Sequence, residues 1–68
     1  MGRYVIAQRM GRKLRLARER KNLTQEEVAS RAKIHVSTLG RIERGESNPP
    51  LQTLGKIAQV VGVKLSLN

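Results

Sequence analysis

The sequence predicts a small all-α fold of four to five helices, and three observations carry that prediction. Apolar residues recur every three or four positions through most of the chain, the spacing that brings them to one face of a helix. Glycine, asparagine and proline stand between these segments, where such residues end one helix and separate it from the next. A chain of 68 residues has room for a thin core and no deep cleft. We therefore expect residues 1–68 to form a single domain.

A strong positive charge narrows the class of partner. The formal net charge is +9, and residues 1–22 carry +7 of it, with eight basic side chains against Glu19. Such an excess attracts polyanions before any specific contact forms. Tyr4 is the only aromatic residue, which argues against binding modes that stack single-stranded bases on aromatic side chains. Duplex DNA is therefore the favoured partner.

Other kinds of chemistry find little support in the composition. The chain has no cysteine, and His35 is its only histidine, so no disulfide, thiolate site or imidazole cluster is expected. No catalytic set and no phosphate-binding loop is visible, which predicts a protein without enzymatic activity, metal or cofactor. Without an apolar stretch of roughly 18–20 residues, we expect no membrane span and a soluble, cytoplasmic protein.

The first helix is expected at about residues 6–21. Ile6, Met10, Leu14 and Ala17 follow one another at steps of three and four, and Asn22 stands where a left-handed residue usually ends a helix. Leu16 lies off this apolar stripe. It is either a candidate partner surface or an ordinary exposed leucine.

The second helix, at about residues 25–32, has the strongest start signal in the chain. Thr24 and Glu27 have the spacing of a capping box, in which each side chain accepts a hydrogen bond from the other residue's amide. Leu23 and Val28 occupy the two positions of a hydrophobic staple. The expected inward face is Val28, Ala29 and Ala32.

A tight turn over residues 33–35 leads to a third helix at about residues 36–44. His35 stands at its N-cap position, where histidine is a poor capping residue, and Gly45 is its stop signal. Leu39 and Ile42 form its inward face. Two short helices joined by such a turn can place the second one in the major groove of DNA.

The remainder is a loop, a fourth helix and a tail. Pro49 and Pro50 mark the loop, and the helix is expected at residues 51–61 because Gly62 closes its apolar pattern. Its apolar positions are Leu51, Leu54, Ile57, Ala58 and Val61. Residues 63–68 alternate apolar and polar side chains, which is typical of a short C-terminal β-strand, although the start of a fifth helix is also open.

Three segments together resemble the Cro/repressor-type (XRE-like) helix-turn-helix family. They are LTQEEVA at 23–29, STLGRIERG at 37–45 and NP at 48–49, and the resemblance covers about residues 10–63. It implies a compact lambda-repressor-like helical bundle that binds operator DNA as a symmetric dimer and usually represses transcription.

The resemblance also implies roles for particular residues. Gln25 would bind a phosphate and steady a base-reading side chain, and Arg18 would pair with Glu43 as part of the architecture. The positions that would face base edges are His35, Val36, Ser37 and Arg41. The expected phosphate contacts are Thr24, Gln25, Lys33, Thr38 and Arg44.

The chemistry of these side chains agrees, with alternatives. Arg41 can donate two parallel hydrogen bonds to guanine, or it is a solvated arginine. Val36 offers a methyl group to thymine and Ser37 can bond a phosphate or a base, yet either residue can also be ordinary helix surface. His35 departs from the family's Ser or Thr, which weakens the cap and points a longer side chain toward DNA. Gly40, a further departure, either permits a closer approach to the groove or is tolerated drift.

These expectations describe a repressor that binds a palindromic or pseudo-palindromic operator as a homodimer. The fourth helix and the tail would supply the dimer contact, through Leu51, Leu54, Val63, Leu65 and Leu67. The alternative is the antitoxin of a toxin–antitoxin pair, whose toxin protein would dock on the first helix or on the tail.

Overall fold

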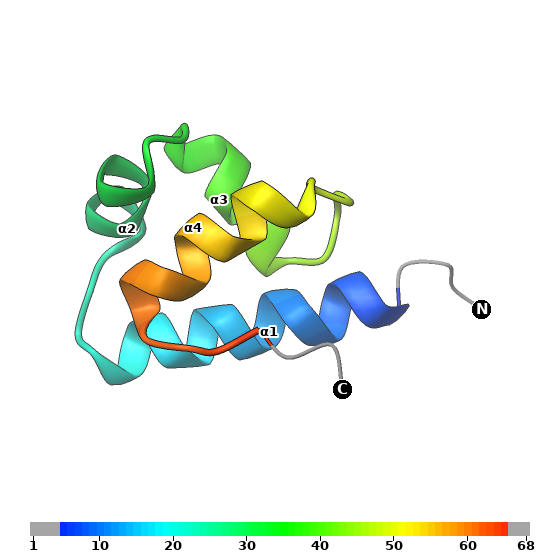
Figure 1. The fold of residues 1–68 in the computed structure, drawn as a ribbon, viewed down its shortest axis with the longest axis horizontal. Helices are drawn as coiled ribbons and strands as arrows, with labels where there is room; N and C mark the ends of the chain where they lie inside the picture. Colours follow the sequence, from blue (N-terminus) through cyan, green and yellow to red (C-terminus); the bar gives the residue numbers. More distant parts are fainter. Residues whose placement is uncertain (1–4, 66–68) are drawn as a thin grey trace.

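The computed structural model describes residues 5–65, which form four α-helices and contain no strand (Figure 1). The helices are α1 (Val5–Arg20), α2 (Gln25–Ala32), α3 (Val36–Glu43) and α4 (Leu51–Val61). The predicted all-α class is confirmed. Residues 63–65, the first half of the expected terminal strand, have no regular secondary structure, and the second half lies outside the described residues.

The helices contact one another in a closed ring. α1 packs against α3 and α4, and α2 packs against the same two helices. In Figure 1 the long α1 lies beneath α4, and α2 lies above the C-terminal end of α1, at the left of the view. α3 therefore has two faces, one packed against α1 and α2 and one directed away from them.

One large apolar side chain from each helix lies at the centre of the core. Leu14, Val28, Leu39 and Ile57 are the largest fully buried side chains. Small residues fill most of the space around them, so the helices approach closely and the core is thin. The other buried apolar residues are Ala17, Ala29, Ala32, Ile42, Ala58 and Val61.

Two residues that follow the apolar spacing of their helices are on the surface. Ile6 is 76% exposed and Leu51 is 59% exposed. Each lies in the first turn of its helix, at an end of the bundle where α1 extends past its neighbours (Figure 1). Helical periodicity identifies the inward face of a helix, but it does not show how far along that face a neighbour extends.

The stop signals act at the expected places. Asn22 has a φ of 57°, Gly45 a φ of 73° and Gly62 a φ of 79°, all in the left-handed region. One left-handed residue carries no such signal: Lys33 ends α2 with a φ of 59°. A side chain in this conformation costs roughly 1–2 kcal/mol, which the surrounding packing must offset.

Gly11 is a point of close backbone contact between α1 and α3. It is buried, and a methyl group in its place would overlap the carbonyl oxygen of Ile42 and lie 2.9 Å from that of Glu43. Only glycine lets the two backbones come this near. This contact brings the C-terminal end of α3 against the middle of α1.

Candidate nucleic-acid interface

The start of α2 is held by the predicted capping box. Thr24 Oγ1 accepts a hydrogen bond from the Glu27 amide at 3.0 Å, and Glu27 Oε1 accepts one from the Thr24 amide at 2.8 Å. The bond from the Thr24 backbone amide, and after it the Thr24 side chain, favours the ionised carboxylate and so lowers the pKa of Glu27. Two amides that no helix carbonyl can reach are thereby satisfied.

The turn between α2 and α3 is closed by its own backbone. The Lys33 amide donates to the carbonyl of Ser30 at 3.2 Å, and the Ile34 amide donates to that of Ala29 at 2.9 Å. Ile34 is partly buried and packs against the core. His35 then begins α3 in an extended conformation and makes no capping hydrogen bond with its side chain. The predicted weak cap is therefore present.

The outward face of α3 presents the four side chains expected to read bases. His35, Val36, Ser37 and Arg41 are all exposed, and Val36 is 40% exposed despite being apolar. Ser37 and Arg41 are four residues apart, on the side of the helix opposite the buried Leu39. We call these four residues the reading face.

The opposite side of α3 carries a buried network of charge and amide groups. Arg18 Nε donates to Glu43 Oε2 at 2.7 Å and Arg18 Nη2 donates to Glu43 Oε1 at 3.0 Å. A third donor, Gln25 Nε2, reaches the same Oε1 at 2.9 Å. Arg18 Nη1 also donates to the carbonyl of Leu23 at 2.9 Å. The network therefore joins α1, the start of α2 and the end of α3.

Burial makes this network a strong constraint. Glu43 is 6% exposed, the one buried charged residue among those described, and two of its bonds form a bidentate pair with a guanidinium. The hydrogen bond to Glu43 raises the pKa of Arg18. Removing one partner of such a pair leaves a charge without a partner in a poorly solvated place.

Gln25 has a role in the structure that sequence reasoning missed. The family resemblance gave it a phosphate and a base-reading neighbour, whereas here its amide donates to Glu43. An amide nitrogen carries two hydrogens, so one remains available. Gln25 and Glu43 are 18 residues apart, and no local pattern connects them. Only the approach of α2 to the end of α3 reveals the contact.

Gly40 is covered by the protein itself. It is buried, and a methyl group in its place would lie 3.2 Å from Arg44 Nη1 and 3.9 Å from Gln25 Nε2. Arg44 also donates hydrogen bonds to Glu46, from Nε at 3.0 Å and from Nη2 at 3.2 Å. These bonds are the main reason that the pKa of Glu46 is lowered. Both partners are exposed, so this pair contributes little and a phosphate can displace it.

The other expected phosphate contacts lie at separate points around α3. Thr24 stands at the start of α2, Lys33 in the turn and Thr38 in α3, and all three are exposed. The Thr24 hydroxyl oxygen already accepts a hydrogen bond from the Glu27 amide.

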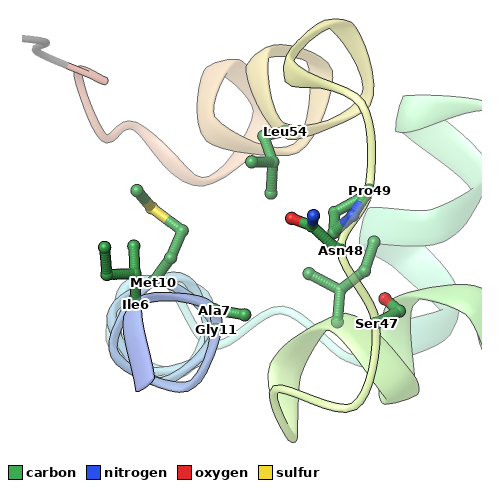
Figure 2. Close-up of a pocket in the computed structure, with 9 residues that line it drawn as sticks. Ile6, Ala7, Met10, Gly11, Ser47, Asn48, Pro49 and Leu54 are labelled. Atoms are coloured by element: carbon green, nitrogen blue, oxygen red, sulfur yellow. The ribbon is translucent and has the colours of Figure 1, made fainter. Parts of the chain in front are cut away.

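A shallow hollow lies on the side of α3 away from this face (Figure 2). Met10 and Ile6 of α1 lie across it from Leu54 of α4, and the loop after α3 closes it. Its volume is about 270 Å³, and no charged side chain lines it. The lining is Ile6, Ala7, Met10, Gly11, Ile42, Ser47, Asn48, Pro49 and Leu54.

The residues expected at a dimer contact are not equally accessible. Leu51 is exposed, whereas Leu54, Val63 and Leu65 are partly buried and pack against the core of their own chain. Leu67 lies outside the described residues.

Residues 5–65 contain neither a cluster of potential metal ligands nor a helix that could cross a membrane. No group of three or more His, Cys, Asp and Glu side chains is placed to hold a metal ion. Within the same range, every helix is too short or too polar to cross a bilayer.

Comparison with known proteins gives one consistent result. A family model described as helix-turn-helix matches residues 14–68. The immunity repressor protein of Bacillus phage phi105 is 35% identical over 57 residues, covering 84% of this chain and 40% of the repressor. An HTH-type transcriptional regulator of Sinorhizobium fredii is 49% identical over 49 residues, covering 72% and 62%. One from Methanocaldococcus jannaschii is 39% identical over 56 residues, covering 82% and 85%. The chain thus spans less than two thirds of the length of the first two relatives.

Proposed function

The chain belongs to the XRE-type helix-turn-helix family of transcriptional regulators, and on this premise we propose that it is a repressor whose α3 enters the major groove of duplex DNA. The observation that supports this most is the division of α3 into two faces. Its inner face is tied to α1 and α2 through Glu43, while its reading face is exposed along the whole helix. At eight residues, α3 spans about 12 Å, close to the width of the groove.

Arg41 makes the strongest base contact in this proposal. Its guanidinium is exposed and makes no ion pair within residues 5–65, so it can donate two parallel hydrogen bonds to guanine O6 and N7. Ser37, one turn earlier, reaches an adjacent base or phosphate, and Val36 offers methyl groups to thymine. His35 extends from the first turn of α3 toward the same bases.

Phosphate contacts hold the helix in register. Gln25 donates its second amide hydrogen to a phosphate while Glu43 holds the first, so the network orients the amide before DNA arrives. Thr24, Lys33, Thr38 and Arg44 bind phosphates on either side. Each cation that neutralises a phosphate releases counterions, so affinity falls steeply with added salt.

The regulator acts as a homodimer on a palindromic or pseudo-palindromic operator. Two-fold symmetry places the two α3 helices in successive major grooves, about 34 Å apart. The exposed Leu51 is the apolar residue of α4 that a partner can cover, with Leu54 beside it and the tail residues Val63, Leu65 and Leu67.

Selection of bound duplexes from a random pool tests the proposal. We expect a two-fold related site, bound less tightly as salt increases. Arg41→Ala should relax the preference at one base pair of each half-site, by about 1–3 kcal/mol of discrimination. Arg31→Ala, which removes the same charge from exposed surface of α2, is the matched control and should leave the preference unchanged.

Two outcomes would count against it. If the purified protein bound no duplex of any sequence in low salt, DNA recognition itself would be wrong. If Arg41→Ala kept the full sequence preference, Arg41 would not be a base-reading residue, while the rest of the proposal would remain.

A further inference from the structure

α1 carries a second surface that the proposed DNA recognition does not use. A shallow groove of about 320 Å³ lies between α1 and the segment after α4. We call it the basic groove. It is lined by Arg9, Arg12, Lys13, Leu16, Ala17, Arg20 and Val63.

The basic groove lies on the far side of α1 from α3. Gly11 and Arg18 are two of the α1 residues that contact α3, Gly11 through the backbone of Ile42 and Glu43 and Arg18 through the Glu43 carboxylate. At 100° per residue, the directions of Lys13, Leu16 and Arg20 are roughly opposite to those two contacts. A duplex held by the reading face therefore does not cover the groove.

The cations of the groove have no counter-charge within the described residues. No acidic side chain lines it. Glu19, the one acidic residue of α1, lies 4.0 Å from Arg15 and 3.9 Å from Arg18 and is not among the residues that line the groove. Four basic side chains therefore surround the groove and repel one another until an anionic partner arrives.

The centre of the groove is apolar, which separates it from a simple phosphate-binding surface. Leu16 is 41% exposed and lies beside Ala17 and the partly buried Val63. A duplex backbone offers anions but no side chain that would remove Leu16 from water. An acidic protein segment offers both, because its carboxylates meet the cations while an apolar side chain covers the leucine.

A second copy of this chain does not supply the charge. Glu43 is buried in its network, Glu27 closes the capping box, and Glu46 is paired with Arg44. Only Glu19 and Glu26 remain, against fourteen basic residues. Two copies would therefore bring mainly like charges together at this surface.

We propose that the basic groove binds an acidic segment of another protein, with an apolar side chain of that segment placed over Leu16. The surface is independent of the reading face, and of its lining residues only Val63 also belongs to the proposed dimer contact. The proposal goes beyond DNA recognition and does not depend on it.

Two synthetic peptides test it by fluorescence anisotropy. One is a labelled 16-residue peptide of glutamate with leucine at every third or fourth position, and the other is glutamate throughout. We expect the leucine-containing peptide to bind about tenfold tighter, as covering one leucine allows. Leu16→Gln should remove this difference and leave binding of the all-glutamate peptide unchanged. Because Leu16 is exposed, thermal unfolding of the variant should match the wild type.

A charge-reversal pair gives the second readout. Lys13→Glu should weaken both peptides several-fold at low salt, whereas Lys56→Glu, an equal change of charge on α4, should have a much smaller effect. Leu16→Gln should leave binding to the selected operator unchanged.

Three results would overturn the proposal. The first is equal affinity for the two peptides, and the second is equal weakening by Lys13→Glu and Lys56→Glu, which would indicate net charge alone. The third result combines two observations. Binding of a non-operator duplex of 20 base pairs is weakened by Lys13→Glu but not by Leu16→Gln, and the protein shows no preference for the leucine-containing peptide. That combination would assign the groove to nucleic-acid backbone.

Discussion

The starts of α2 and α3 solve the same physical problem in opposite ways. Each helix begins with amides that no helix carbonyl can reach. At α2, Thr24 and Glu27 satisfy two of them by reciprocal hydrogen bonds. At α3, His35 makes no such bond, and its neighbours Val36 and Ser37 are exposed. The amides at the start of α2 are satisfied by local side chains, whereas the start of α3 has no side-chain cap and remains accessible.

This difference shows what holds a recognition helix in place. α2 begins where it does because of a local motif, whereas α3 is placed from its opposite end, where Glu43 joins Arg18 and Gln25. Its first turn, which we propose contacts DNA, therefore need not stabilise the fold. Stability is assigned to the inner face of α3, where Glu43 is held, and recognition to its outward face, which includes Arg41 in the last turn.

Glu43→Ala breaks the tertiary part of this arrangement and should have the largest effect. It leaves the Arg18 guanidinium, 11% exposed, without its main partner, a change that typically costs about 3–5 kcal/mol. For a domain of this size, that corresponds to a fall in Tm of well over 10 °C, at about 4–8 °C per kcal/mol. Thermal unfolding followed by circular dichroism measures it.

A double-mutant cycle is the control for Glu43→Ala. Arg18→Ala, Glu43→Ala and their combination should be strongly non-additive, because the second change removes a charge that the first left without a partner. Additive losses would mean that the two residues stabilise the protein separately, and α3 would then not be placed by this network.

Thr24→Ala breaks the local part and should cost about 1 kcal/mol, the usual value of an N-cap side chain. The effect arises because the Glu27 amide loses its acceptor at 3.0 Å. Thr24→Ser, which keeps the hydroxyl, should be close to wild type. An equal loss in both variants would indicate that the threonine methyl group, and not the cap, supports α2.

His35→Ser should sharpen the comparison by giving α3 the cap that it lacks. We expect a gain in stability of about 0.5–1 kcal/mol relative to His35→Ala, since serine is a good N-cap residue. Binding to the selected operator should weaken nevertheless, because the proposed base contact is lost. A variant that was more stable and bound the operator equally well would remove His35 from the reading face.

Low pH should weaken the capping box at the start of α2, and we expect this to be the smallest of the changes in stability. The folded-state pKa of Glu27 is lowered, so its contribution is complete above the ordinary pKa of glutamate, about 4.3, and is lost as pH falls through the lowered value. The stability difference between wild type and Glu27→Gln should therefore shrink in that range. A difference that stayed constant between neutral pH and the lowest pH tested would contradict the capping role of the carboxylate.

The sequence by itself determined the features whose causes are local. The capping box of Thr24 and Glu27 and the left-handed stop at Asn22 each depend on a few consecutive residues, so composition and spacing were enough. The apolar spacing also identified the inward faces, including Leu14 and Ile57. The positions of the reading face came from the family resemblance, and the structure shows that all four are exposed.

Tertiary structure decided whatever depends on how helices meet. It left Ile6 exposed despite its spacing, and it made Gly11 a point where α1 and α3 touch. It also brought Gln25 to Glu43 across 18 residues. A hydrogen bond or a close approach between distant residues depends on the position and rotation of two helices at once. The periodicity of one helix specifies only which way its own side chains point.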